Sequence, residues 1–417
     1  MKNILYLSII FLSSCAYQSN AFNGEYEIPK IESTDVNVTI EDFKSHITYL
    51  SSDGLRGRGS GTPGDRLAKD YIVNHFKNAG GSTERLVEVQ EHYVSNKRGK
   101  PKQKVKTYNI IAILPGNDEV LKNEYVIIGA HYDSVKNQLG LIHNGADDNA
   151  SGTAMVLELF EKFASTNSHK RTLVFMAFGG EELGLLGSKY YVNNPTIDLS
   201  KVQLMINLDM VGRMDEEKNV QLGGSPSAKN FSAKLHPFFV NSPINIIDLG
   251  KGIFSRSDHY NFYKKDIPVL FFFTGIHKDY HTATDDEDKI NYPGMMEISN
   301  VVEPILAEFS NVSERLVFEK MEDEKQPAQS PSKMKVTLGV MPDYSYDEKG
   351  LKVDSVVSNR PAKKAGVQDG DVVLKIANTD IVDIYKYMEA LSGIEPGEKT
   401  KIIILRDEKE IELHVQF

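Results

Sequence analysis

Five apolar runs of strand length constrain the fold of this chain most strongly. They lie at residues 107–114, 125–130, 172–178, 202–208 and 267–273. Most of their consecutive positions are apolar, which is typical of strands buried on both faces of a largely parallel sheet. Amphipathic helical patterns precede and separate the runs, at 65–77 and, most clearly, at 152–164. Strands that alternate with helices predict an α/β fold, a three-layer sandwich around a mostly parallel mixed sheet.

The length of the chain, 417 residues, exceeds what one compact core usually organises. The charged, proline-containing stretch at 319–333 predicts a linker, so we expect a large domain at 40–318 and a small one at 334–417. The composition, 40% hydrophobic and 25% charged, is that of an ordinary globular protein. A net charge of −10 provides no basic surface for nucleic acid, so we exclude that class of partner.

The amino terminus has the pattern of an export signal. Residues 1–14 contain a lysine, an apolar run too short to span a membrane, and small residues. The tetrad LSSC resembles the lipobox of bacterial lipoproteins, which implies cleavage before Cys15, lipidation of its thiol and a polar tether over 15–39. An ordinary signal peptide with an incidental cysteine is the alternative. We expect an exported, membrane-anchored lipoprotein, and Ala16 favours the outer membrane, facing the periplasm or the cell surface.

Polar side chains that can bind metal follow four of the apolar runs, and one more lies at the start of the 152–164 helix. In chain order they are His131, Asp148, Glu181 with Glu182, Asp209 and His281. Ligands of open α/β sheets bind beyond the carboxyl ends of the strands, so we expect these side chains to converge. Two imidazoles with carboxylates suit zinc, with other divalent metals as alternatives. With the Glu181-Glu182 pair counted once, two imidazoles and three carboxylates make five ligands, more than one zinc needs, so the sequence predicts two metals that share a carboxylate.

Taken one at a time, these residues have ordinary explanations. Asp148 fits a helix N-cap, His131 a hydrogen-bonded histidine, and Glu181-Glu182 a solvated turn. Their convergence at one edge of the sheet is what favours a metal site. The histidines outside the motifs have no other metal-binding side chains beside them in such a pattern, and we expect none of them to bind metal. They are His46, His75, His92, His143, His169, His236 and His414.

Five motifs carry a resemblance to a known family. GAHYDS, GADDNASG, FGGEELGLLGS, NLDMVG and DYHTATD occur in this order and resemble the double-zinc aminopeptidase family, of the aminopeptidase Y and bacterial leucyl aminopeptidase type. The resemblance covers roughly residues 40–316 and implies a zinc exopeptidase-like fold with two Zn²⁺ ions. It implies that Asp148 bridges both ions. One ion is completed by His131 and Asp209, and the other by Glu182 and His281.

The resemblance also implies catalytic roles. Glu181 is the general base that takes a proton from water activated by the zinc ions and delivers it to the leaving amine. Asp133 resembles the carboxylate that orients the imidazole of His131. Tyr280 resembles a position that stabilises the tetrahedral oxyanion, with simple packing as the alternative. His259, in SRSDHYNF, resembles a residue of the pocket lining rather than an additional ligand.

Residues 334–417 resemble a PDZ domain, a small β-sandwich or barrel, through PAKKAG and the Gly-Asp pair that follows it. Such a domain adds an extended peptide, usually a carboxy terminus, as a strand while loop N–H groups hold its carboxylate. The resemblance places this loop at Thr337, Leu338, Gly339 and Val340, without the second glycine of the common pattern. A stabilising or autoinhibitory lid with no peptide ligand is the alternative.

These patterns together predict a zinc-dependent exported aminopeptidase that hydrolyses amino-terminal residues from peptides. A carboxypeptidase or dipeptidase on the same scaffold is an alternative, because relatives share the metal site and differ in the pocket. A glutaminyl cyclase, typically with one zinc, fits the full ligand set less well. A non-catalytic PDZ-containing peptide-binding lipoprotein is the alternative from another class, and the presence of Asp148, Glu181 and Glu182 argues against it.

Overall fold

The structure is a computed structural model whose described residues form two β-sheets, the larger with a hydrophobic core on each face and the smaller with a core of its own. It describes residues 37–81, 84–96, 103–135, 141–240, 242–250, 256–321, 336–342, 349–357, 360–382, 386–387, 390–391, 393–407 and 409–417. The predicted signal peptide, Cys15, most of the tether and most of the linker lie outside the described residues. Within the described part, no helix combines the length and apolar character needed to cross a membrane.

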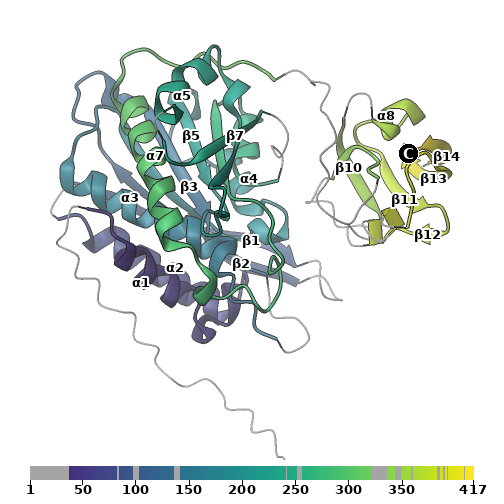
Figure 1. The fold of residues 1–417 in the computed structure, drawn as a ribbon, viewed down its shortest axis with the longest axis horizontal. Helices are drawn as coiled ribbons and strands as arrows, with labels where there is room; N and C mark the ends of the chain where they lie inside the picture. Colours follow the sequence, from purple (N-terminus) through teal and green to yellow (C-terminus); the bar gives the residue numbers. More distant parts are fainter. Residues whose placement is uncertain are drawn as a thin grey trace, which may run out of the picture.

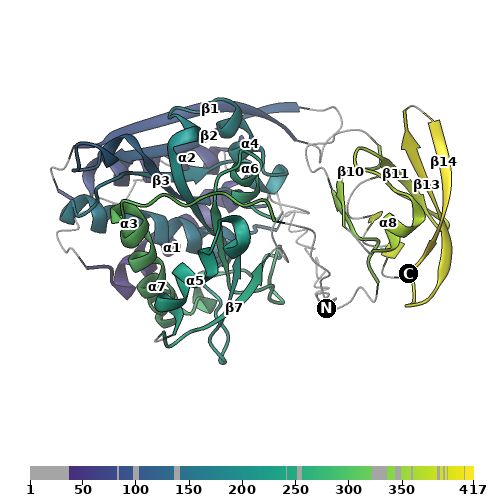
Figure 2. The ribbon, with the colours of Figure 1, turned by 90° about the horizontal axis from the view of Figure 1, so that it is seen from above.

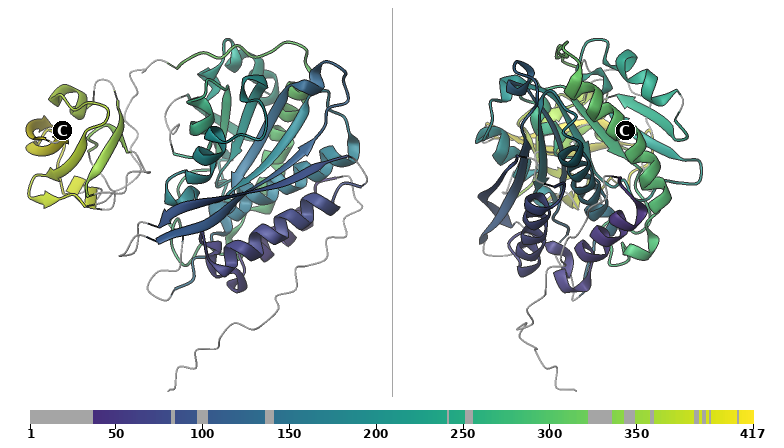
Figure 3. Two further views of the ribbon diagram at one scale, coloured as in Figure 1. Left: turned by 180° about the vertical axis from the view of Figure 1, so that it is seen from behind. Right: turned by 90° about the vertical axis from the view of Figure 1, so that its left-hand side faces the viewer.

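The larger sheet has eight strands in the order β1-β2-β4-β3-β5-β8-β6-β7 (Figure 1). The strands are β1 (Leu86–Asn96), β2 (Gln103–Leu114), β3 (Tyr125–His131), β4 (Thr172–Phe178), β5 (Val202–Leu208), β6 (Asn219–Gly223), β7 (Asn245–Gly250) and β8 (Val269–Phe273). The adjacent strands β4, β3, β5 and β8 are parallel, whereas β1 with β2, β2 with β4, and β6 with β8 pair antiparallel. The predicted mostly parallel mixed sheet is confirmed. Figure 3 shows the long β1–β2 pair from behind.

Helices cover both faces of this sheet (Figures 1 and 2). One face carries α1 (Ile40–Leu50), α2 (Pro63–Asn78), α3 (Gly152–Thr166), α5 (Phe231–Phe239) and α7 (Tyr292–Asn311), and the other α4 (Leu186–Asn193) and α6 (His259–Tyr263). Successive residues of β3 alternate between the two cores: Val126 and Ile128 pack under the first group of helices, and Ile127 under the second. A strand covered on both faces needs apolar side chains at consecutive positions, which is why its sequence does not alternate.

Side-chain caps define where the first two helices begin. Thr39 and Asp42 form a capping box at the start of α1, in which each side chain bonds the other residue's main-chain N–H. The hydroxyl of Thr62 accepts from the N–H of Asp65 at the start of α2, and Pro63 occupies the first helical position. These caps set where α1 and α2 begin, and each helix contributes a buried histidine described below.

The larger domain continues past residue 318. The N–H of Glu319 donates to the carbonyl of Ser227 at 2.9 Å, and that of Met321 donates to the hydroxyl of Tyr263 at 2.9 Å. The Met321 side chain is buried in the core beneath α6. The first three residues of the predicted linker therefore pack on the large domain, because Met321 is an apolar side chain within an otherwise charged stretch.

The smaller sheet belongs to the carboxy-terminal domain. Its strands are β9 (Val340–Pro342), β10 (Leu351–Val356), β11 (Val372–Ile376), β12 (Thr379–Asp380), β13 (Lys399–Arg406) and β14 (Lys409–Gln416), with the short helix α8 (Pro361–Ala365). The order is β14-β13-β11-β10-β9, with β12 beside β11, and all pairs are antiparallel. Its core contains Leu338, Val353 and Ile404, among others.

Candidate metal centre

The parallel strands bring two of the predicted ligands and the predicted general base to one edge of the large sheet. His131 is the last residue of β3, and Asp209 directly follows β5. Glu181 opens a short 3₁₀ turn, Glu181–Leu183, after β4. The Nε2 atom of His131 lies 3.3 Å from Asp209 Oδ1 and 3.9 Å from Glu181 Oε2. The carboxyl ends of neighbouring parallel strands thus converge as the strand-end argument predicts.

Asp148 joins this group to a second one. It lies in the turn Ala146–Ser151 that leads into α3. Its Oδ1 atom is 3.3 Å from His131 Nε2, and its Oδ2 atom is 3.0 Å from His281 Nε2, which also lies 3.3 Å from Glu182 Oε2. Two clusters with metal-ligand spacing lie here, one formed by His131, Glu181 and Asp209 and the other by Asp148, Glu182 and His281. One carboxylate with an oxygen toward each imidazole has the arrangement expected of a ligand shared by two metals.

The electrostatics of the centre fit bound cations. Burial raises the pKa of Glu181 well above its usual range and also raises that of Glu182. Burial would lower the pKa of His131 and His281, but the surrounding carboxylates outweigh it and raise both well above the usual value. Glu182 Oε1 is buried without a hydrogen-bond donor from any described residue. Buried carboxylates that exceed their donors, mixed with imidazole nitrogens, are a donor set suited to divalent zinc.

Asp133 contacts both His131 and Glu181, though its contact with His131 is not through the carboxylate that the resemblance implies. His131 Nδ1 lies 3.0 Å from the main-chain carbonyl of Asp133 and 3.8 Å from its carboxylate. Because a carbonyl only accepts, Nδ1 donates a proton to it, and Nε2 is the nitrogen that faces the centre, where a metal would take the place of its proton. The Asp133 carboxylate instead accepts from the N–H of Glu181 at 3.1 Å and from Ser60 Oγ at 3.0 Å. It therefore positions the turn that carries Glu181.

Tyr280 and His259 each stack on an aromatic neighbour. The Tyr280 ring stacks on the His281 imidazole, with centroids 3.8 Å apart. Burial raises the pKa of Tyr280 well above its usual value, so the hydroxyl keeps its proton. Packing of Tyr280 is thus observed, and its oxyanion role stays a prediction. His259 is fully buried, stacks on Phe271 with centroids 4.4 Å apart, and belongs to neither cluster of metal-ligand spacing.

Three positioning residues of the centre were not predicted from the sequence. The Asn149 side chain donates to the carbonyl of Leu208 at 2.9 Å and accepts from the Met210 N–H at 3.2 Å, which fixes the Asp148 turn to the end of β5. The Asp285 carboxylate accepts from the N–H of Asp148 at 3.0 Å. Asn149 and Asp285 lie inside two of the five motifs, GADDNASG and DYHTATD. Their closeness in sequence to the ligands Asp148 and His281 is the signal that could have identified them.

Arg58 is the third of these residues. Its guanidinium is fully buried and donates to four main-chain carbonyls, those of Leu50, Tyr132, Asn144 and Gly145, at 2.5–2.9 Å. Burial lowers its pKa to about 10. Tyr132 directly follows His131, and Gly145 precedes the turn that carries Asp148. Arg58 therefore ties together the two loops that present these ligands.

The predicted peptide-binding loop of the small domain lies against the start of α8. The carbonyl of Leu338 accepts from the N–H of Ala362 at 2.8 Å, and the N–H of Gly339 donates to Thr337 Oγ1 at 3.1 Å. Gly339 has φ +80°, and a Cβ there would lie 2.1 Å from Cβ of Arg360. Only glycine suits this position, which then leads into β9 at Val340.

The fold and the paired clusters define a class of protein. BSAP, a zinc aminopeptidase from Bacillus subtilis, has a solved structure that matches with a TM-score of 0.57 at 18% identity, over 67% of this chain and 97% of that one. An aminopeptidase from Aneurinibacillus sp. strain AM-1 matches with a TM-score of 0.53 at 20% identity, over 68% and 97%. The larger domain therefore has the fold of the zinc aminopeptidases.

Family models make the assignment specific. Residues 109–306 match the model of peptidase family M28, and residues 322–417 match the PDZ domain. The larger domain belongs to peptidase family M28, and the chain carries a carboxy-terminal PDZ domain. Leupeptin-inactivating enzyme 1 of Streptomyces exfoliatus is 32% identical over 255 residues, and a probable leucine aminopeptidase of Arthroderma otae 30% over 223. These matches cover 58% and 49% of this chain, and 51% and 58% of the two relatives.

Proposed function

We propose that this chain is an aminopeptidase that releases amino-terminal residues from peptides with the help of two zinc ions. The position of the Asp148 carboxylate, with one oxygen toward His131 and the other toward His281, carries the proposal. Each of these imidazoles has a further carboxylate beside it, Asp209 or Glu182, as two sites that share one ligand require. The relatives named as leucine aminopeptidases support this choice of reaction.

Each residue of the centre has a role in this proposal. Asp148 would be the ligand that both ions share, His131 and Asp209 would hold one ion, and Glu182 and His281 would hold the other. Zinc supplies Lewis acidity toward water and toward the substrate carbonyl.

Glu181 acts on the proton. It accepts a proton from the water whose oxygen attacks the carbonyl carbon, and it gives this proton to the amine nitrogen as the C–N bond breaks. The Asp133 carboxylate holds the N–H of Glu181 at 3.1 Å and so keeps the base beside the reacting atoms.

The test is a substrate panel with and without chelator. Aminoacyl anilides and short peptides, free or blocked at either end, are assayed with the chain lacking residues 1–15, with its Glu181→Gln variant and with Glu216→Gln, a control at an exposed glutamate. We expect chelator-sensitive cleavage of free-amine substrates, lost in Glu181→Gln and kept in the control. Cleavage of amino-blocked peptides would move the assignment to a carboxypeptidase, and metal-independent cleavage, or none, would overturn the proposal.

We also propose that the chain is exported and anchored through a lipid on Cys15, and that its PDZ domain binds peptide carboxy termini. The LSSC tetrad supports the anchor, and the PDZ match supports the peptide ligand. Fractionation of cells that express the wild type or Cys15→Ser tests the anchor: the wild type should be in membranes and the variant released. Equal distribution would contradict it. A carboxy-terminal peptide library against the full chain tests the PDZ ligand, and selection without a carboxylate preference would count against it.

A further inference from the structure

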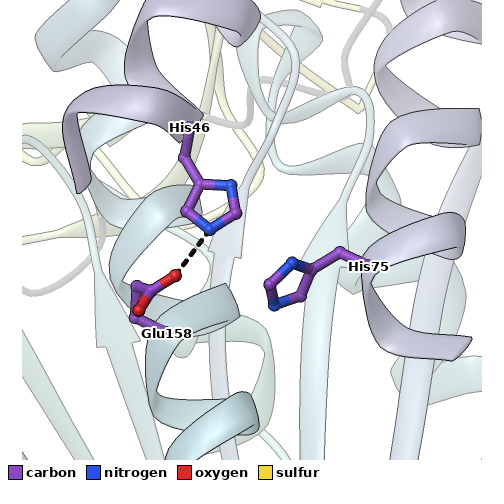
Figure 4. A group of neighbouring side chains, drawn as sticks. All are labelled: His46, His75 and Glu158. Carbon is purple, nitrogen blue, oxygen red and sulfur yellow. Dashed lines mark hydrogen bonds and ion pairs between the residues drawn. The ribbon is translucent and has the colours of Figure 1, made fainter. Parts of the chain in front are cut away.

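A third group of metal-binding side chains lies between α1, α2 and α3. His46 comes from α1, His75 from α2 and Glu158 from α3, and all three are buried (Figure 4). One nitrogen of each imidazole and one oxygen of Glu158 lie within 4.8 Å of one another. Glu158 is six residues beyond Gly152, the first residue of α3, so it lies about 9 Å along the helix from the turn that carries Asp148. The group is therefore separate from the centre described above.

His75 presents a lone pair to this group. Its Nε2 atom is 3.2 Å from the main-chain carbonyl of Leu157, and because a carbonyl only accepts, Nε2 carries the proton. Nδ1 is then an acceptor, and it is buried without a hydrogen-bond partner among the described residues. A buried imidazole with an unused lone pair calls for a ligand.

His46 and Glu158 face the same point. His46 Nε2 is 2.7 Å from Glu158 Oε1, the contact dashed in Figure 4, and its Nδ1 is 2.7 Å from the hydroxyl of Tyr71. The His75 ring lies beside this pair, with its centroid 4.8 Å from that of His46. Metal-bound histidines almost always donate their other N–H to an outer partner, which fixes the ring. Tyr71 provides that partner for His46, and Leu157 provides it for His75.

The buried carboxylates around these histidines also favour a bound cation. A second carboxylate on α3, that of Glu161, is also buried, 3.7 Å from His75 Nε2 and near Arg85. A divalent ion would satisfy the Glu158 carboxylate and both imidazoles.

We propose that His46, His75 and Glu158 hold a third divalent cation, best matched by zinc, that links α1 and α2 to α3. Two imidazoles and one carboxylate are zinc ligands, and the fourth position is left to a water or to the second oxygen of Glu158. Zinc at about 2.1 Å from each donor places the donors about 3.4 Å apart, so the side chains have to shift by only about 1 Å. The site is closed to substrate, so its role is structural, and the metal enters as the chain folds.

Metal counting on the full chain tests this proposal. Zinc per chain is measured by mass spectrometry after chelator treatment of the folded protein. We expect chelator to strip the partly exposed centre quickly and to leave one equivalent in the buried site. The Asp148→Asn variant should keep that equivalent, so the outcome is independent of the proposed catalytic metals. His75→Gln and Glu158→Gln should lose it.

A matched control uses His169→Gln. His169 is also fully buried, with Nε2 3.3 Å from the carbonyl of Leu114, but it belongs to no cluster of metal-ligand spacing. This variant should keep the equivalent. If the ligand variants fail to fold, anomalous scattering at the zinc edge from wild-type crystals decides: a peak among His46, His75 and Glu158 supports the site. A Asp148→Asn chain without tightly held zinc, or crystals with only water there, would overturn it.

Discussion

Replacement of Arg58 by methionine should destabilise the large domain and loosen the metal centre together. The four carbonyls that its guanidinium serves are those of Leu50, Tyr132, Asn144 and Gly145. Two of them adjoin ligand-bearing segments, the end of β3 with His131 and the turn with Asp148. Methionine fills much of the same volume but donates no hydrogen bond, so the substitution separates the bonds from the packing.

The magnitude follows from the contacts. A buried carbonyl left without a donor costs about 1–3 kcal/mol. The Gly145 carbonyl also accepts from the Ala150 N–H at 3.2 Å, so three carbonyls count fully and the loss is roughly 3–9 kcal/mol. Burial lowers the Arg58 pKa to about 10, so burying the charge destabilises the folded wild type by about 3 kcal/mol. The methionine variant lacks this destabilisation, which offsets part of the loss. The middle of the range leaves a net decrease of about 3 kcal/mol in the free energy of unfolding.

Arg171→Met is the matched control. Arg171 is fully buried, donates to the carbonyls of Phe309 and Val312 and pairs with Glu124, but it precedes β4 and so lies at the opposite end of the strands. Urea unfolding should show both variants destabilised. At a temperature where both are folded, only Arg58→Met should lose zinc and kcat/KM. A free energy of unfolding within about 1 kcal/mol of wild type, or unchanged kcat/KM in Arg58→Met, would refute the reasoning.

Three further outcomes are expected. Asp148→Asn should lose zinc from both clusters at once by metal analysis, and a variant that retains one of those two ions would contradict the shared ligand. Burial raises the pKa of Asp65 to about 7, so the folded state holds its proton more tightly than the unfolded state. The stability of the wild type relative to Asp65→Asn should therefore be greatest below about pH 4 and fall as pH rises to about 7, and a flat difference in urea midpoints would count against this pKa. Gly339→Val should lower the unfolding temperature of the PDZ domain, because φ is +80° and the new Cβ would lie 2.1 Å from Cβ of Arg360. The kcat/KM for aminoacyl anilides should stay unchanged. Equal unfolding temperatures of the variant and the wild type would show that the loop tolerates a side chain.

The strands that carry the centre could be read from the sequence because they are buried on both faces. The runs at 172–178 and 202–208 form β4 and β5 at the residues predicted, and 125–130 forms β3 with His131 added. The strands at the edges of the sheet have weaker apolar patterns in the sequence. β7, for example, is largely exposed or half-buried, so its sequence lacks an apolar run.

The residues that hold the ligands in place were harder to predict. Arg58 acts through carbonyls far away in the chain, and no periodicity records such contacts. His46 and His75 were expected to be ordinary histidines because nothing nearby in the sequence accompanies them. Glu158, which joins them, lies on α3 and was counted only as part of a helix. Local patterns thus find strand ends but not the partners that tertiary packing brings to them.

The place of β8 in the sheet determines when activity can arise. His281 follows β8, which pairs with β5 on one side and β6 on the other, whereas His131 belongs to β3, far earlier in the chain. A growing chain that ends before β8 contains every other proposed ligand but not the last imidazole. Under the proposed function, the metal centre is therefore complete only after nearly the whole domain has been synthesised and its sheet has formed.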